Sequence, residues 1–280
     1  MTERGRMTMV KLGYQTNTWG GVIGAAGGVT SVKEAYYWAN GSTEEAIAQI
    51  AAAGYSGFEL FEGNLMSYES NPEQFKALCT KYNMSFIGVY TGGNLIYPDI
   101  LEDEFYKIRR VAQFAASLGA EQLVIGGGAI RAAGIQDSDY ERLADALNKL
   151  DQLAAELGLK ATYHPHLGTI VQNWEQLQRI MSLTSISLCP DTAHLEAGGC
   201  DPVKVVETYK DRIPYIHFKD LKGSEFVPLG QGQQNFEAML DILMKNGYSG
   251  WITTELDSYP DPKAGAQLSY SYLQKLLQTK

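Results

Sequence analysis

The sequence predicts one α/β domain folded as a (β/α)8 barrel, and two observations carry that prediction. Eight short apolar runs alternate with longer segments of helical period, which is the element count of such a barrel. Several of the runs, such as residues 122–125 and 186–189, lack polar alternation, as is typical of strands covered on both faces. At 280 residues the chain is long enough to bury the core that this fold needs.

An open doubly wound sheet is the competing architecture. That fold is marked by a Gly-x-Gly-x-x-Gly stretch after its first strand, and none follows residues 10–15 here. Polar residues instead follow apolar runs along the whole chain, and in a barrel such strand ends converge on one face. The barrel is favoured, with strands expected at residues 10–15, 57–61, 85–90, 122–125, 160–164, 186–189, 215–218 and 251–255.

The segments between these strands have the marks of helices. Gly54, Gly119, Gly158 and Gly247 each follow such a segment, where a left-handed residue commonly ends a helix. Ser42 begins a stretch with capping-box spacing. Apolar stripes with steps of three and four residues indicate packing faces. They are Leu101, Phe105, Ile108, Ala112 and Ala115, and Leu143, Leu147, Leu150, Ala154 and Leu157.

Two N-terminal stretches do not fit the alternation. Residues 1–8 are expected to be a flexible tail. Residues 20–41, between the first strand and its helix, are rich in glycine and aromatic residues. A loop of that length on the C-terminal face is predicted to be a lid, with an aromatic among Tyr36, Tyr37 and Trp38 excluding water; mobile filler is the alternative. No interdomain linker is evident, so residues 1–280 are expected to form one domain.

Composition excludes several classes of function. A formal charge of −9 and a pI near 5.0 argue against binding nucleic acid through its phosphates. No apolar run approaches the length of a membrane span, and the N-terminus lacks a hydrophobic signal core. Cys79, Cys189 and Cys200 form an odd set without paired metal spacing. These features predict a cytoplasmic protein with reduced thiols that acts on a small molecule.

All four histidines fall at or just past the ends of predicted strands. They occur in Tyr163-His164-Pro-His166, Asp191-Thr-Ala-His194 and His217-Phe-Lys-Asp220, and a further strand ends in Thr253-Thr-Glu255. Imidazole and carboxylate groups gathered from several strand ends suit one divalent metal ion with positions left for a substrate. The pattern predicts a metalloenzyme.

These motifs resemble those of the xylose-isomerase-like TIM barrel superfamily of sugar isomerases, epimerases and inosose dehydratases. The sharpest matches follow the family's order and are Asp191-Thr-Ala-His194, His217-Phe-Lys-Asp220, Pro228-Leu-Gly-Gln-Gly232 and Gly250-Trp-Ile-Thr-Thr-Glu255. The resemblance covers most of the chain. By position it implies one divalent ion held by His164, Asp191, His217 and Glu255, and it implies a homodimer or homotetramer. Two imidazoles with two carboxylates suit Mn²⁺ or Co²⁺, with Mg²⁺ or Zn²⁺ left open.

One match departs from the family pattern. Related sugar isomerases carry a glutamate in a Glu-Asn-His-Pro-Gly-Thr-like stretch on strand five, whereas this chain has His164-Pro-His166-Leu-Gly168-Thr169. The nearest parallel is the inosose dehydratase branch. Epimerases of the group exchange a proton across one carbon between two carboxylates. Here His164 replaces one of them, although a neutral imidazole can itself act as a base.

The resemblance implies chemistry next to a carbonyl group. The metal acts as a Lewis acid, Glu255 or His164 removes the neighbouring proton, and an enediolate forms. Reprotonation gives isomerisation or epimerisation of a sugar or polyol, and loss of a β-hydroxyl gives dehydration of an inosose. The ligand set does not separate these outcomes. Substrate contacts are expected from His166, His194, Lys219, Glu59 and Arg131.

Each candidate has a structural alternative. Asp191 suits a helix N-cap, and His164 suits a packed core histidine. His166 suits a residue that orients a ligand, and Glu59 suits an ion pair with an arginine. The run Gly126-Gly-Gly128 ahead of Arg131 suits a close turn as well as an anion site.

Two other classes of function are alternatives to the metalloenzyme, and the sequence disfavours both. A DNA-repair endonuclease of the AP-endonuclease kind has the same overall barrel, but the acidic charge and only four histidines are unfavourable for a multi-zinc DNA enzyme. A non-catalytic sugar-binding protein needs neither metal nor base, and the motif-bearing strand ends argue against it.

Overall fold

The computed structural model describes residues 32–257 and 259–278. Its main sheet is parallel, and each strand pairs with the next one along the chain. Leu123, Val124 and Ile125 of β3 are fully buried, and every other residue of that strand is buried too. The strands are β1 (Gly57–Phe61), β2 (Ser85–Gly93), β3 (Gln122–Gly127), β4 (Lys160–Tyr163) and β5 (Ser187–Leu188).

The sheet continues round the barrel through shorter strands. A parallel bridge between Asp191 and His217 links the end of β5 to β6 (Ile216–Phe218). In turn β6 pairs in parallel with β9 (Ile252–Thr254). The expected barrel is confirmed, and its strands agree with those expected from residue 57 onward to within about three residues at either end. The expected strand at residues 10–15 lies outside the described residues.

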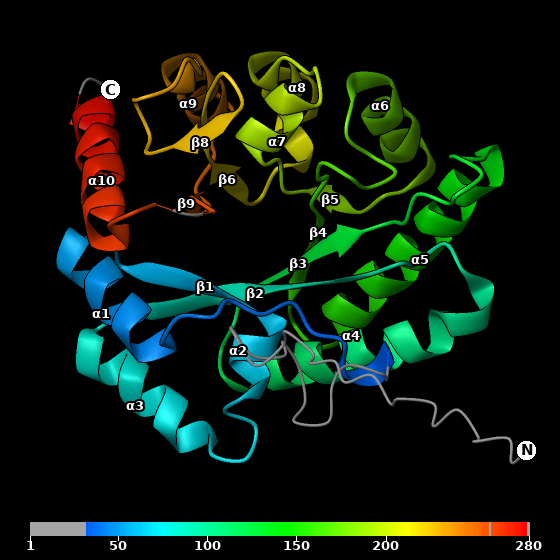
Figure 1. Ribbon diagram of the computed structural model, residues 1–280, viewed down its shortest axis with the longest axis horizontal. Helices are drawn as coiled ribbons and strands as arrows, with labels where there is room; N and C mark the ends of the chain where they lie inside the picture. Colours follow the sequence, from blue (N-terminus) through cyan, green and yellow to red (C-terminus); the bar gives the residue numbers. More distant parts are fainter. Residues whose placement is uncertain (1–31, 258, 279–280) are drawn as a thin grey trace, which may run out of the picture.

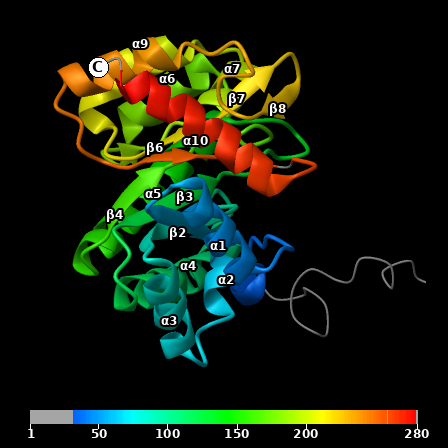
Figure 2. The same cartoon turned by 90° about the vertical axis from the view of Figure 1, so that its left-hand side faces the viewer.

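Helices cover the outside of the barrel. In Figures 1 and 2 the first half of the chain and the second half form two stacked parts, and α1 and α10, from opposite ends of the chain, lie side by side. The helices are α1 (Thr43–Ala53), α2 (Glu62–Met66), α3 (Pro72–Tyr82), α4 (Leu101–Ser117), α5 (Asp137–Glu156), α6 (Trp174–Leu183), α7 (Thr192–Ala197), α8 (Pro202–Tyr209), α9 (Phe236–Lys245) and α10 (Pro262–Gln278). Single 3-10 turns are η2 (Val32–Glu34), η3 (Pro98–Ile100) and η4 (Lys210–Arg212). None of the helices in this part of the chain is long and apolar enough to cross a membrane.

The predicted helix signals are confirmed. Ile108, Ala112 and Ala115 of α4 are fully buried, as are Leu143 and Leu147 of α5. The four glycines predicted to end helices all have positive φ. Ser42 caps α1, because its hydroxyl accepts the Glu45 N–H at 3.3 Å.

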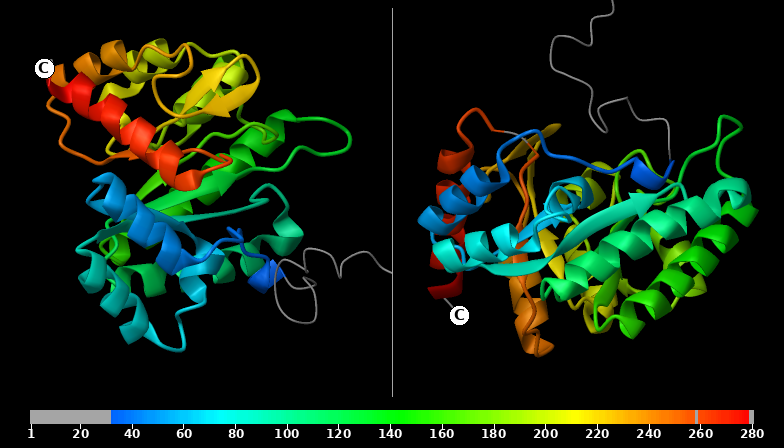
Figure 3. Two further views of the ribbon diagram at one scale, coloured as in Figure 1. Left: turned by 60° about the vertical axis from the view of Figure 1, so that its left-hand side comes forward. Right: turned by 90° about the horizontal axis from the view of Figure 1, so that it is seen from below.

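A short antiparallel hairpin was not predicted. It consists of β7 (Asp220–Lys222) and β8 (Glu225–Val227), and it lies against α7 (Figure 3). Gly223, at φ 65°, turns the chain between the two strands. The hairpin holds Phe226 over the C-terminal rim, where its ring contacts His194 with 5.0 Å between centroids.

Asp220 fixes the loop that follows this hairpin. Its buried carboxylate accepts N–H groups from Gly230 at 2.9 Å and Gly232 at 2.8 Å. It also accepts those of Leu221 at 2.9 Å and Gln234 at 3.4 Å. A Cβ at position 232 would approach Asp220 Oδ1 to 2.1 Å, so only glycine fits there. One carboxylate therefore accepts the backbone N–H groups that would otherwise be without partners in this loop.

The Asp220→Asn variant should lower the free energy of unfolding by roughly 2–3 kcal/mol. In the variant, an amide NH2 group would face backbone N–H groups that now donate hydrogen bonds to a carboxylate oxygen. Urea denaturation measures the change. Asp145→Asn is the matched control, since that aspartate forms only an exposed ion pair with Lys149 and its loss should cost about 0.5 kcal/mol or less. Equal stability of the two variants would contradict the role of Asp220.

Candidate metal centre

Four residues from separate strand ends meet at the C-terminal rim. His164 directly follows β4, Asp191 precedes α7, His217 lies on β6 and Glu255 follows β9. Each offers one potential ligand atom, and these atoms all lie within 4.8 Å of one another. The structure thus brings together the four residues that the resemblance implied.

Asp191 serves two purposes at once. Its Oδ1 accepts the N–H groups of Ala193 and His194, both at 3.0 Å, so the residue is the N-cap of α7. Its Oδ2 is buried and has no hydrogen-bond partner among the described residues. That oxygen lies 3.9 Å from His164 Nε2 and 3.5 Å from Lys219 Nζ. Capping therefore orients the carboxylate and leaves one oxygen facing the cluster.

His164 is a buried neutral imidazole. Burial and the nearby charge of His217 hold its pKa well below the ordinary value. Its Nδ1 is buried without a hydrogen-bond partner in the described residues. The ring of Tyr90 packs edge-on against it at 5.5 Å between centroids. An uncharged imidazole with an unpartnered nitrogen is suited to bind a metal ion.

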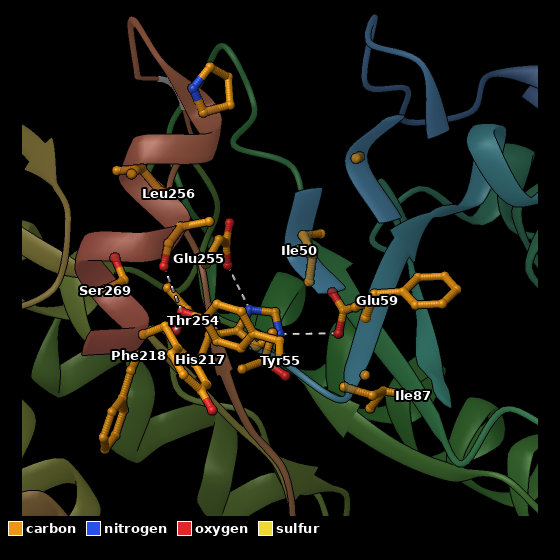
Figure 4. Close-up of a pocket in the computed structure, with 18 of the residues that line it drawn as sticks. Ile50, Tyr55, Glu59, Ile87, His217, Phe218, Thr254, Glu255, Leu256 and Ser269 are labelled. Atoms are coloured by element: carbon orange, nitrogen blue, oxygen red, sulfur yellow. Dashed lines mark hydrogen bonds and ion pairs between the residues drawn. The ribbon is translucent and has the colours of Figure 1, made fainter. Parts of the chain in front are cut away.

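Two carboxylates hold His217 from opposite sides, as Figure 4 shows. Its Nδ1 lies 2.6 Å from Glu255 Oε2, and its Nε2 lies 3.1 Å from Glu59 Oε2. Although burial opposes protonation, Cys189, Glu59 and Glu255 raise the pKa of His217 well above its ordinary value. To bind a metal ion, His217 would lose the proton on one ring nitrogen. The carboxylate at the other nitrogen would then keep the ring oriented.

Lys219 is the buried cation of this cluster. Its ammonium lies 3.2 Å from Glu255 Oε1 and 3.0 Å from His194 Nε2, and it also contacts Asp257. Burial favours the neutral amine, but Asp191, Glu255 and Asp257 raise its pKa, so the side chain is charged. In turn, although burial opposes ionisation, His217 and Lys219 keep the pKa of Glu255 well below its ordinary value.

The rings of His166 and His194 are in contact, tilted by 39° to each other, next to the four-residue cluster. Their ring centroids are 3.6 Å apart, and the His166 ring is 6.2 Å from that of His164. Burial and the charge of Lys219 lower the pKa of His194 to about 3. His194 is therefore an uncharged imidazole, and both rings present hydrogen-bonding edges beside the cluster.

Arg131 belongs to a different network. Its Nε donates to Asp139 Oδ1 at 2.8 Å and its NH2 group donates to the carbonyl of Ile96 at 3.1 Å. The guanidinium also stacks on Tyr97, 4.6 Å from the ring centroid. None of these partners belongs to the four-residue cluster. The pairing of Arg131 with Asp139 anchors the start of α5. Binding of a substrate anion by Arg131 stays a prediction.

Part of the predicted lid packs on α2. The N–H of Tyr37 donates to Glu62 at 3.0 Å, and that of Gly63 donates to the Tyr37 carbonyl at 2.9 Å. A Cβ at position 63 would come within 2.4 Å of the Trp38 ring, so glycine permits this approach. The Tyr37 ring meets Tyr90 edge-on. Residues 20–31 of the lid lie outside the described residues, and closure over a substrate stays a prediction.

These donors fit a divalent metal ion. The unpartnered Asp191 Oδ2 is a buried polar atom that such an ion would satisfy, and His164 Nε2 lies 3.9 Å from it. Two imidazoles and two carboxylates form a set of intermediate softness. The sulfur of Cys189 also lies within 4.8 Å of a ring nitrogen of His164 and of His217. However, burial raises the pKa of this thiol and disfavours the thiolate that binds metal.

Comparison with known proteins agrees with this arrangement. The family model described as "Xylose isomerase-like TIM barrel" matches residues 47–276. The chain belongs to that family. The match spans His164, Asp191, His217 and Glu255, so the family resemblance seen in the sequence is confirmed.

Curated relatives are similar along most of the chain. An inosose dehydratase of Clostridium beijerinckii is 30% identical over 254 residues, which cover 78% of this chain and 83% of the relative. The inosose dehydratase of Lacticaseibacillus casei is 29% identical over 251 residues, covering 78% and 83%. A solved D-tagatose 3-epimerase-like protein has a TM-score of 0.70 at 20% identity, covering 81% of this chain and 90% of that structure, and shows the shared fold. As expected, the chain is an enzyme of this family.

Proposed function

We propose that the chain is a divalent-metal-dependent lyase that removes water from an inosose or a closely related cyclic keto-polyol. The observation that carries this proposal is a half-buried carboxylate, Glu255, 3.2 Å from the buried ammonium of Lys219. Dehydration needs a base for one proton and a donor for the departing hydroxyl, and this pair supplies both within one cluster. The inosose dehydratases among its relatives support the same reaction class.

His164, Asp191, His217 and Glu255 would hold the ion, with Mn²⁺ or Co²⁺ best suited to the set. When bound, the ion supplies Lewis acidity toward the substrate carbonyl. The Glu255 carboxylate then takes the proton from the carbon next to that carbonyl, and the enediolate forms. The C–O bond of the β-hydroxyl breaks as the electrons of the enediolate form the new double bond. The oxygen leaves as water after it takes a proton from the Lys219 ammonium.

Substrate binding falls to the groups around Lys219. The ammonium donates hydrogen bonds toward the oxygen that gains negative charge. His166 and His194, whose ring centroids are 3.6 Å apart, are placed to bind ring hydroxyls. Phe226 closes the site from the hairpin side and keeps water from the ammonium, which lies 4.4 Å from its ring centroid.

Epimerisation or isomerisation is the second candidate, and one observation favours it. Glu59 and Glu255 flank the same imidazole from opposite sides, at 3.1 and 2.6 Å. Two carboxylates on opposite faces of a substrate would allow a proton to leave one face and return to the other. Both candidates share the first proton abstraction.

Incubating the Mn²⁺-loaded protein with a panel of inososes and ketoses in D2O tests the two candidates together. Deuterium uptake reports enolisation, and product mass separates loss of water from isomerisation. We expect deuterium exchange and a dehydrated product with an inosose. Deuterium at one inverted carbon without loss of water would select the epimerase, and no exchange with any substrate would contradict both.

The His164→Gln variant separates the two roles of that residue. If His164 is a ligand, metal affinity should fall by about 10-fold or more, because an amide oxygen replaces an imidazole nitrogen. If it is a second base, metal content should persist and proton exchange at one face of the substrate should disappear. Elemental analysis and deuterium exchange in the same sample distinguish the outcomes. We expect the loss of metal, because His164 is buried and its Nε2 lies 3.9 Å from Asp191 Oδ2.

A further inference from the structure

The hydroxyl group of Tyr90 lies on the side of the barrel mouth away from Lys219, and we propose that it forms a hydrogen bond with one ring hydroxyl of the substrate. This role rests on the proposed function, because it takes the substrate to be an uncharged ring polyol such as an inosose. Tyr90 would then determine which hydroxylated rings the site accepts.

Strand register places this hydroxyl toward the carboxyl ends of the strands. Tyr90 of β2 pairs with Val124 of β3. A Cβ at Gly126, two residues further along β3, would lie 1.9 Å from the Tyr90 oxygen. The side chain therefore rises from the level of Val124 to that of Gly126, in the direction of the rim where barrel active sites lie. His164, directly after β4, meets the Tyr90 ring there, 5.5 Å away between centroids.

Three neighbouring rings hold the Tyr90 ring in place. Tyr37 and Phe61 meet it edge-on, with centroids 5.3 and 5.4 Å away. The ring of His164 is perpendicular to it. Tyr90 is 8% exposed, so its ring cannot swing away from these neighbours. The hydroxyl is thus held in one direction before a substrate arrives, and little side-chain entropy is lost when it binds.

The Tyr90 hydroxyl forms no hydrogen bond within the part of the chain that the structure describes. Buried tyrosine hydroxyls usually have a partner. Tyr215 shows the contrast. It also packs edge-on against a histidine of the cluster, with its centroid 5.2 Å from that of His217, but its hydroxyl lies 2.6 Å from Thr253 Oγ1. Tyr90 therefore keeps a donor and an acceptor for a group that the described residues do not supply.

Two glycines leave space beside this hydroxyl. Gly92 of β2 pairs with Gly126 of β3, and Gly92 lies two residues beyond Tyr90 on the same face of its strand. Neither strand therefore carries a side chain above Tyr90 at this level. Glycine within a strand often marks the close approach of a ligand or of another backbone. Here it would let a substrate ring lie against the strands with the Tyr90 hydroxyl at its edge.

Strand order places Tyr90 across the mouth from Lys219. From β2 the sheet passes through β3, β4 and β5 before it reaches β6, so β2 and β6 are four positions apart. That is half the circumference of an eight-stranded barrel. Lys219 directly follows β6. A ring whose reacting carbons face Lys219 would turn a hydroxyl away from the carbonyl toward Tyr90.

Calorimetric titration of the Mn²⁺-loaded protein with myo-inositol tests this contact, because that ring polyol has no carbonyl and does not react. Tyr90→Phe removes only the hydroxyl. It should weaken binding about 5- to 10-fold, the usual effect of losing one hydrogen bond between uncharged groups. Tyr215→Phe is the matched control, and it should leave the affinity unchanged because its hydroxyl already has a partner in Thr253.

Monodeoxy derivatives of myo-inositol locate the contact. The wild type should bind the derivative that lacks the relevant hydroxyl about 5- to 10-fold more weakly than myo-inositol. Tyr90→Phe should bind these two rings equally, because the same hydrogen bond is already lost. If Tyr90 only supports His164, the variant should instead bind every ring more weakly by one common factor, and that result would overturn the inference. Equal binding of all the rings by the wild type, or no binding of any, would overturn it without a variant.

Product analysis with an inosose in the same preparations separates this role from the proposed function. A dehydrated product, together with equal affinities of the wild type and Tyr90→Phe for every ring, would overturn the role of Tyr90 and leave dehydration standing. Selection among rings that depends on Tyr90, without any dehydrated product, would support the role of Tyr90 and contradict dehydration.

Discussion

The Glu255→Gln variant should lose turnover by about 100-fold or more while keeping part of its metal affinity, since removing a general base typically has that effect. Glutamine keeps the shape and one coordinating oxygen of the side chain but removes the basic site. A carboxylate bound to a metal is a weak base, and His217 and Lys219 already lower the pKa of Glu255. It would be sufficient if a metal ion held by these residues acidified the substrate C–H through the carbonyl.

Two controls interpret this variant. Glu225→Gln makes the same chemical change on the exposed face of the hairpin, and it should leave turnover at the wild-type rate. Glu59→Gln removes the other carboxylate on His217. A dehydratase should keep most of its proton exchange in that variant, whereas a two-base epimerase should lose inversion. A Glu255→Gln enzyme that exchanges substrate protons with D2O at the wild-type rate would rule out Glu255 as the base.

The Asp191→Ser variant should reduce metal affinity by at least about 100-fold and leave the barrel folded. Serine retains an oxygen that can cap α7 but removes Oδ2, the atom that faces the cluster. Elemental analysis after dialysis measures the retained metal. His217→Ala should likewise abolish metal retention, because it removes an imidazole ligand and the partner of both Glu59 and Glu255.

Asp201 provides the control for helix capping. It caps α8 as Asp191 caps α7, accepting the N–H groups of Val203 at 2.9 Å and Lys204 at 3.3 Å, but it is exposed. Asp201→Ala should therefore cost about 1 kcal/mol of stability and leave metal content unchanged. Full metal occupancy in both Asp191→Ser and His217→Ala would refute the proposed ligand set.

Periodicity predicted most of the fold because its signals are local. The strand expected at residues 57–61 is β1 as observed, and the apolar stripe from Leu101 is the buried face of α4. The hairpin of β7 and β8 was missed because its strands have three residues each, too few for a period to show. Its signal was Gly223 between Lys222 and Glu225, a turn residue in a two-residue loop.

Site residues were predictable where a strand end places them. Sequence reasoning left Asp191 open between helix cap and ligand, and the structure shows why, because its two oxygens divide those tasks. The contacts of Lys219 with His194, Glu255 and Asp257 depend on barrel closure and leave no local pattern. Likewise, the pairing of Arg131 with Asp139 depends on how the chain turns into α5.

Contacts between residues far apart in the sequence also bear on how the protein folds. Strands β1 to β4 each pair with the next strand along the chain, whereas Tyr55 and Thr254 are joined by a 3.0 Å hydrogen bond between residues 199 apart. Glu59 and His217, 158 residues apart, meet in the same region. Joining distant segments carries a large loop-closure entropy, so we expect these contacts to form late. Because Glu255 follows β9, we expect the last step of folding also to assemble the candidate metal centre.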